Sequence, residues 1–84
     1  MKEYTDAWLK ESGFPERLRQ ARKAADMTQN DVAYETYTSV SQIARMEKGE
    51  VAPSIAKVVE LADLYGISVD WLCGRTDNNG NDPE

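Results

Sequence analysis

The stretch Thr28–Gly49, TQNDVAYETYTSVSQIARMEKG, predicts two short helices joined by a tight turn. Thr28 and Asp31 stand at the spacing of a capping box, in which each side chain bonds the other residue's backbone amide. Ser39 and Gln42 repeat that spacing, so a second helix is expected to begin there. Gly49 is typical of a residue that ends a helix. Two helices of this length bury little surface by themselves, so the flanking segments must supply the core.

The segments on both sides of this stretch also have helical patterns. Upstream, Pro15 suits the first turn of a helix, and Asp26 falls where that helix must end. Downstream, residues 54–66 place a wide apolar face between a Ser cap and a terminal Gly, and residues 68–74 repeat this plan over a shorter length. No stretch alternates apolar and polar residues as a strand does. The predicted fold class is all-α: a compact five-helix domain, with an additional N-terminal helix as an open alternative.

The chain is expected to form one domain with a short segment at each end. Residues 1–13 are predicted to be an N-terminal arm or short helix, because Tyr4 and Trp8 lie at helical spacing. Packing on the domain, self-association and fraying are the alternatives for this segment. Residues 14–75 form the predicted helical domain. Residues 76–84, TDNNGNDPE, are predicted to be a disordered acidic tail.

The composition excludes several kinds of chemistry. The 84 residues include one cysteine, Cys73, and no histidine, which excludes a disulfide framework, a Cys/His zinc site and His-based acid–base catalysis. Without a His partner, Cys73 is expected to be a small, partly buried side chain and not a nucleophile. We therefore predict no enzyme, no cofactor and no metal site. With no secretory signal and no bilayer-spanning run, the expected location is the cytoplasm, without a membrane partner.

The charge is unevenly distributed along the chain. The net charge of −5 is unfavourable to nucleic acid at long range. Residues 14–49 nevertheless carry six basic and five acidic side chains, so this part is the least acidic. The basic run from Arg17 to Lys23 has the alternative interpretation of a solvated helix face. A locally basic surface on an acidic protein remains an open interpretation.

A series of positions carries a family pattern, in register and without a gap inside the motif. These positions are Phe14, Leu18, Arg22, Thr28, Gln29, Ala33, Ser39, Ile43, Glu47, Gly49, Pro53, Ser54, Ala62, Gly66, Trp71 and Leu72. With them, residues 14–75 resemble the Cro/phage-repressor family of helix-turn-helix regulators, also called the xenobiotic-response-element class. The resemblance implies an ion pair between Arg22 and Glu47 that is structural and ties the first helix to the second helix of the motif. It places the motif at residues 28–49.

The second helix of the motif is the predicted DNA-reading element, because in this family it lies in the major groove. Ala33 is expected to be small where the two motif helices cross, and Ile43 is expected to point into the core. The outward positions hold side chains that suit base edges or phosphates. The residues expected to contact DNA are Gln29, Thr38, Ser39, Val40, Ser41, Gln42, Arg45 and Lys48. The alternatives are a Gln42 side chain used in the capping box, a partly buried Val40 and an Arg45 that is a plain surface charge.

Two positions depart from the family pattern. Tyr37 stands where the family commonly has Gly, and a left-handed Tyr costs about 1–2 kcal/mol, so another turn geometry is an alternative. Glu50 stands in a loop that the family often makes basic, which adds repulsion toward phosphates.

The leading hypothesis is a sequence-specific DNA-binding transcriptional regulator. It is expected to be a repressor that binds an inverted repeat in double-stranded DNA as a homodimer. The alternative is a protein-interaction module with the same fold, such as an antitoxin or a phage accessory factor, which would have a protein partner and weak or no DNA binding.

Overall fold

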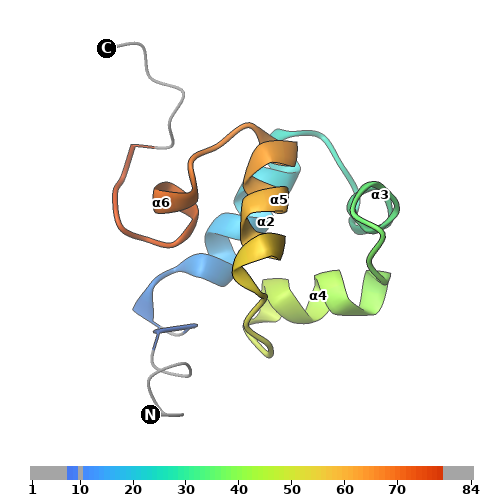
Figure 1. The fold of residues 1–84 in the computed structure, drawn as a ribbon, viewed down its shortest axis with the longest axis horizontal. Coiled ribbons are helices and arrows are strands. Elements are labelled where there is room, and N and C mark those ends of the chain that lie inside the picture. The colour runs from blue at the N-terminus through green and yellow to red at the C-terminus, as the bar shows by residue number, and fades with distance from the viewer. Residues whose placement is uncertain (1–7, 10, 79–84) are drawn as a thin grey trace.

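The computed structural model describes residues 8, 9 and 11–78. Figure 1 labels the helices α2 (Phe14–Ala24), α3 (Gln29–Glu35), α4 (Val40–Lys48), α5 (Ile55–Tyr65) and α6 (Val69–Leu72). No strand occurs among the described residues, and the prediction of an all-α, five-helix domain is confirmed. Trp8, Leu9 and Glu11 are also helical, so the chain begins to turn as a helix before α2. Tyr4, used to predict a helix there, lies outside the described residues.

Hydroxyl side chains start four of these helices. In α3 the capping box is complete, because Thr28 Oγ1 accepts from the Asp31 amide and Asp31 Oδ2 accepts from the Thr28 amide at 2.8 Å. In α4 only half of the box forms: Ser39 Oγ accepts from the Gln42 amide, and no described hydrogen bond returns from the Gln42 side chain. The Gln42 carboxamide is thus left for another partner. The capping oxygens belong to Thr28, Ser39, Ser54 and Ser68.

Each helix from α2 to α6 ends in a left-handed residue, and the next N–H bonds the carbonyl five positions earlier. These left-handed residues are Asp26, Tyr37, Gly49, Gly66 and Gly74. The alternative of another turn geometry at Tyr37 is wrong, since its φ is 52°. The reason is the Thr38 N–H, which donates to the Ala33 carbonyl at 2.9 Å and closes α3 by the same motif as the other helices.

The core lies where the helices converge. α4 packs against both α2 and α3, and α6 packs against α5 and α2. Figure 1 shows α3 and α4 to one side of α5, with α6 on the other side. The largest fully buried side chains are Phe14, Leu18, Val32, Ile43, Met46, Leu61 and Leu72. No helix in the described part of the chain has the length and apolarity needed to cross a membrane.

The described residues of the N-terminal segment pack on the domain. The rings of Trp8 and Phe14 have their centroids 5.2 Å apart, and Leu9 is buried in the core. Gly74 lies so close to this segment that a Cβ added there would collide with the Ser12 carbonyl. The start and the end of the domain are therefore in direct contact.

Arg17 ties the segment after α6 to α2. Its Nη1 donates to the carbonyls of Trp71 at 2.6 Å and Thr76 at 2.8 Å, and its Nη2 pairs with Asp77 at 3.1 Å. The guanidinium also lies over the Trp71 ring, 5.0 Å from its centroid. Arg17 is thus not a plain solvated charge of the basic run. The domain boundaries at 13 and 75 and the disordered tail stay predictions, and residues 79–84 lie outside the described residues.

Candidate nucleic-acid interface

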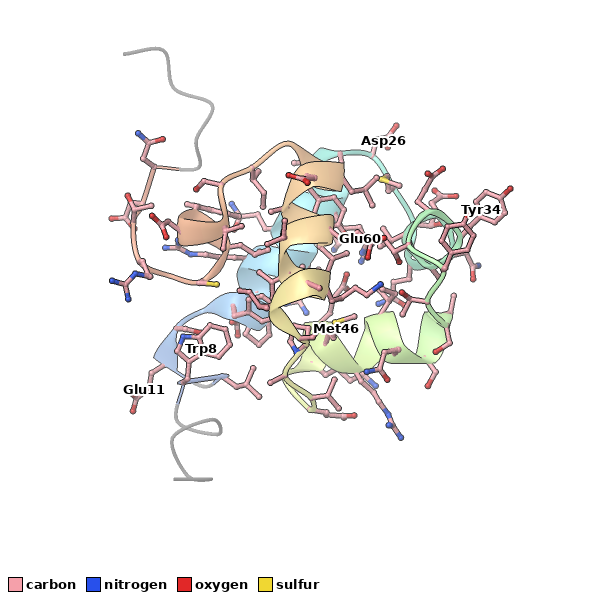
Figure 2. All side chains as sticks on the ribbon, viewed as in Figure 1. Trp8, Glu11, Asp26, Tyr34, Met46 and Glu60 are labelled. Carbon is pink, nitrogen blue, oxygen red and sulfur yellow. The ribbon has the colours of Figure 1, made fainter. Side chains whose placement is uncertain are left out.

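The two faces of α4 differ sharply. Ile43 and Met46 are buried against the other helices, whereas Ser41, Arg45 and Lys48 are exposed. Figure 2 shows Met46 on the side of α4 that faces the other helices. Val40, at the start of α4, is 38% exposed, so it offers a methyl surface to solvent while part of it is covered. The exposed face of α4 combines small polar, apolar and cationic side chains.

The residues at the start of α4 are of three kinds. Ser39 is exposed, and its hydroxyl oxygen is used as the cap. Ser41 is exposed and makes no hydrogen bond through its side chain among those described. Gln42 is half-buried and lines a surface depression with Thr38 and Lys57. Ser41 and Gln42 therefore present the hydrogen-bonding groups that a base edge can pair with.

Thr38 is held inside the turn. Its hydroxyl oxygen lies 2.9 Å from the Thr36 carbonyl and 2.9 Å from Lys57 Nζ. The Lys57 ammonium has only protons to give, so the Thr38 oxygen accepts from it and donates its own proton to Thr36. The Thr38 backbone N–H is used by the Ala33 carbonyl. Thr38, predicted to contact DNA, thus has its donors committed within the protein.

Gln29, at the start of α3, uses part of its side-chain hydrogen-bonding capacity within the protein. Its Nε2 donates to Glu47 Oε1 at 3.1 Å, from a half-buried position. An amide nitrogen carries two protons, so one N–H remains for a phosphate oxygen. Gln29 is therefore both a link between α3 and α4 and a candidate backbone contact.

A buried ion pair fixes α4 to α2. Arg22 Nε donates to Glu47 Oε2 at 2.7 Å and Arg22 Nη2 donates to Glu47 Oε1 at 3.2 Å, and the Glu47 side chain is 2% exposed. Arg22 Nη1 also donates to the Met27 carbonyl at 2.9 Å. The hydrogen bond to Glu47 raises the pKa of the Arg22 guanidinium, against the opposing effect of burial. This pair engages the Arg22 guanidinium within the protein and links α4 to α2. Ala33, on α3, is buried.

Sequence reasoning missed Lys57, on α5. Its Nζ donates to the Thr36 carbonyl at 3.0 Å, to Thr38 Oγ1 at 2.9 Å and to Glu60 Oε1 at 2.8 Å. The Glu60 contact has the helical i, i+3 spacing and was readable from the sequence. The contacts of Lys57 with Thr36 and Thr38 join residues about twenty positions apart. No local sequence pattern indicates such contacts.

No other chemistry is assembled in the described part of the chain. No group of three or more His, Cys, Asp or Glu side chains there is placed to hold a metal ion. Cys73 is half-buried, and burial raises the pKa of its thiol, which disfavours the nucleophilic thiolate.

The model of the helix-turn-helix family matches residues 18–72, well over half of the chain. The chain belongs to this family. The predicted resemblance to the Cro/phage-repressor class is confirmed, and with it the prediction that the domain is not an enzyme.

Several relatives are similar over the same region. The cryptic phage CTXphi transcriptional repressor RstR of Vibrio cholerae is 42% identical over 66 residues, which cover 76% of this chain and 59% of RstR. The uncharacterised helix-turn-helix regulator YobD of Bacillus subtilis is 38% identical, covering 75% of this chain and 56% of YobD. The regulator DdrOP3 of Deinococcus deserti is 35% identical, covering 68% and 44%. The chain therefore spans little more than half of the length of the first relatives that it matches.

Proposed function

We propose that this protein is a sequence-specific DNA-binding transcriptional regulator that acts as a repressor. The observation that carries the proposal is α4, which exposes Ser41 and Arg45 beside the half-buried Gln42, while the Arg22–Glu47 pair links it to α2. In this arrangement the first turn of α4 meets base edges in the major groove. A similar protein named a transcriptional repressor supports the direction of regulation. A cytoplasmic location is part of the same proposal.

In this proposal, the chemistry of each side chain decides whether it contacts a base edge or a phosphate. Gln42 pairs with adenine, Ser41 with either partner, and Val40 contacts a thymine methyl. Arg45 reaches a guanine edge or a phosphate, and Lys48 a phosphate. Ser39 and Gln29 stand at the starts of helices, where backbone amides attract phosphate oxygens. Thr38 contributes through the shape of the turn.

The experiment is selection of binding sites from random double-stranded DNA, followed by measurement of the dissociation constant over a salt series. We expect one enriched motif and an affinity that falls steeply with salt. Arg45→Ala is expected to weaken binding about tenfold or more, as loss of one base contact does. Lys23→Ala is the matched control, because Lys23 is an exposed cation on α2. The proposal fails if no motif is enriched, or if the two variants weaken binding equally.

A homodimer on an inverted repeat is part of the proposal. The two copies of α4 would then enter successive major grooves, with half-sites about 34 Å apart or a multiple of it. Sedimentation of the protein with the selected DNA measures the stoichiometry directly. A selected motif without two-fold symmetry, bound by one copy, would overturn this part.

The second candidate function is a protein-interaction module, which a specific feature favours. Tyr34 is 81% exposed and Tyr37 is 96% exposed, next to the exposed carboxylate of Glu35. Figure 2 shows Tyr34 pointing outward from α3, away from the other helices. An aromatic, acidic surface suits a protein better than a phosphate backbone. Stable capture of a partner protein, without binding of any DNA at low salt, would favour this function.

A further inference from the structure

The turn between α3 and α4 contains a residue with a strained backbone, and packing of its side chain does not offset that strain. Tyr37 is left-handed, which is unfavourable for any residue with a Cβ. Its side chain is 96% exposed, so packing of the ring offsets little of this strain. The groups that hold the turn must therefore lie on either side of Tyr37.

Lys57 contacts both of those sides. Thr36, before Tyr37, offers a carbonyl at the end of α3, where a helix leaves carbonyls unpaired and favours a cation. Thr38, after Tyr37, offers its hydroxyl oxygen. With Glu60 as the third acceptor, all three protons of the ammonium are used, and the Lys57 side chain is only 24% exposed. The protein itself thus supplies an acceptor for each proton of the ammonium.

The other bonds of the turn stay within α3 and the turn itself, where the Thr38 hydroxyl donates to the Thr36 carbonyl at 2.9 Å across Tyr37. Thr36 is buried, and its hydroxyl donates to the Val32 carbonyl at 2.8 Å, which anchors the turn to α3. The Thr38 backbone N–H does the same through Ala33. Both bonds connect the turn to the helix before it. Lys57 connects it to α5, and so to the body of the domain.

We propose that Lys57 is a positioning residue for DNA reading: its ammonium bridges α5 to Thr36 and Thr38 and holds the left-handed turn that sets where α4 begins. The proposal deepens the proposed function and rests on it for the effect on DNA. It also makes a claim about the free protein, namely that removal of the ammonium loosens the turn before DNA is present.

The first test is amide hydrogen exchange of the free protein. Lys57→Met keeps the apolar stem and removes the ammonium. We expect the Thr38 amide to exchange about tenfold faster, the loss of one charge-assisted hydrogen bond, while amides within α2 change much less. Lys23→Met removes the same charge from an exposed site and is expected to leave the Thr38 amide unchanged. Equal exchange of Thr38 in the two variants would overturn the proposal, whether or not the protein binds DNA.

The second test asks whether the effect passes through Tyr37. Tyr37→Gly removes the strain, so Lys57→Met is expected to speed Thr38 exchange much less in that background. With the selected DNA site, Lys57→Met is expected to weaken binding about tenfold more than Lys23→Met, and Tyr37→Gly to restore part of that loss. Additive effects of Lys57→Met and Tyr37→Gly on exchange would show that Lys57 does not support this turn. An unchanged affinity with faster exchange would remove the role in DNA reading.

Discussion

A few single residues in this domain have an energetically unfavourable backbone conformation or an unfavourable burial of a polar group. Two non-glycine residues, Asp26 and Tyr37, are left-handed, and the hydroxyl of Tyr65 is buried without a hydrogen-bond partner among the described residues. Burial is the main cause that raises the pKa of Tyr65 above its usual 10.0, and the negative charge of Glu47 adds to it. Arg22 acts in the opposite direction but is outweighed. The folded state therefore favours the neutral phenol more than the unfolded state does.

Tyr65→Phe tests this residue through pH. Folding raises the pKa of Tyr65, so the contribution of this group to the free energy of unfolding is fully present below about pH 10. That contribution is lost as the pH rises further, because Tyr65 ionises first in the unfolded chain. We expect the free energy of unfolding of the wild type to fall more between pH 9 and 11 than that of Tyr65→Phe. At pH 7 the variant is expected to gain about 1 kcal/mol, since an unsatisfied hydroxyl is removed. Urea unfolding at each pH measures both effects. A loss of 1 kcal/mol or more at pH 7 would show that the hydroxyl has a partner.

At the scale of helices, the structure depends on a few ties between elements. The Arg22–Glu47 pair joins α2 to α4, and Gln29 joins α3 to the same carboxylate. Three helices therefore meet at one buried charge. The orientation of α4 relative to the rest of the domain depends on that charge being matched.

Glu47→Leu is expected to lower the free energy of unfolding by about 3–5 kcal/mol, because it leaves Arg22 buried and unpaired. The double variant Arg22→Met/Glu47→Leu is expected to be clearly more stable than Glu47→Leu, since no uncompensated charge remains. Circular dichroism during thermal and urea unfolding measures both. If the double variant is the less stable of the two, the pair itself and not the isolated charge supplies the stability.

The elements could be predicted from the sequence because their signals are local. Ser39 and Ser54 cap helices through bonds to an amide three residues away, so composition and spacing reveal them. The geometry of Tyr37 could not be predicted in this way, since its own preference opposes the observed turn. The contacts of Lys57 with the turn join distant parts of the chain. The sequence around a long, flexible cationic side chain does not indicate which distant group it will bind.

At the scale of the whole molecule, Figure 1 shows α6 and the segment after it on the side of the domain away from α3 and α4. The N-terminal segment is nearer to α4, since Leu9 lines one surface depression with Lys48 and Gly49. The end segments are held by α2, through Phe14 for the first and Arg17 for the second. Packing of these segments therefore stabilises the fold, and the first of them borders the end of α4 that carries Lys48.

Arg17→Met is expected to release the residues after α6, because it removes three hydrogen bonds and a cation–π contact. Trypsin cleavage after Arg75 in the folded protein is expected to become about tenfold faster, the equivalent of one lost charge-assisted bond. Arg19→Met, on an exposed position of the same helix, is the control. Mass spectrometry of the fragments gives the rate at each bond. Equal rates in the two variants would mean that Arg17 does not hold this segment.

The contact of Gly74 with the Ser12 carbonyl has a consequence for the order in which the helices can follow one another along the chain. Because these two points touch, a short linker can join the ends of the domain without stretching it. New termini can then open at Ala52, an exposed position in the connection between α4 and α5. Such a circularly permuted chain would be synthesised with α5 and α6 first and α4 last. It would keep the core residues of α2 to α6 and the outward face of α4, but it would lose Leu9, which lies before the join. Its folding would show that the shape of the domain does not depend on the order in which its helices are made.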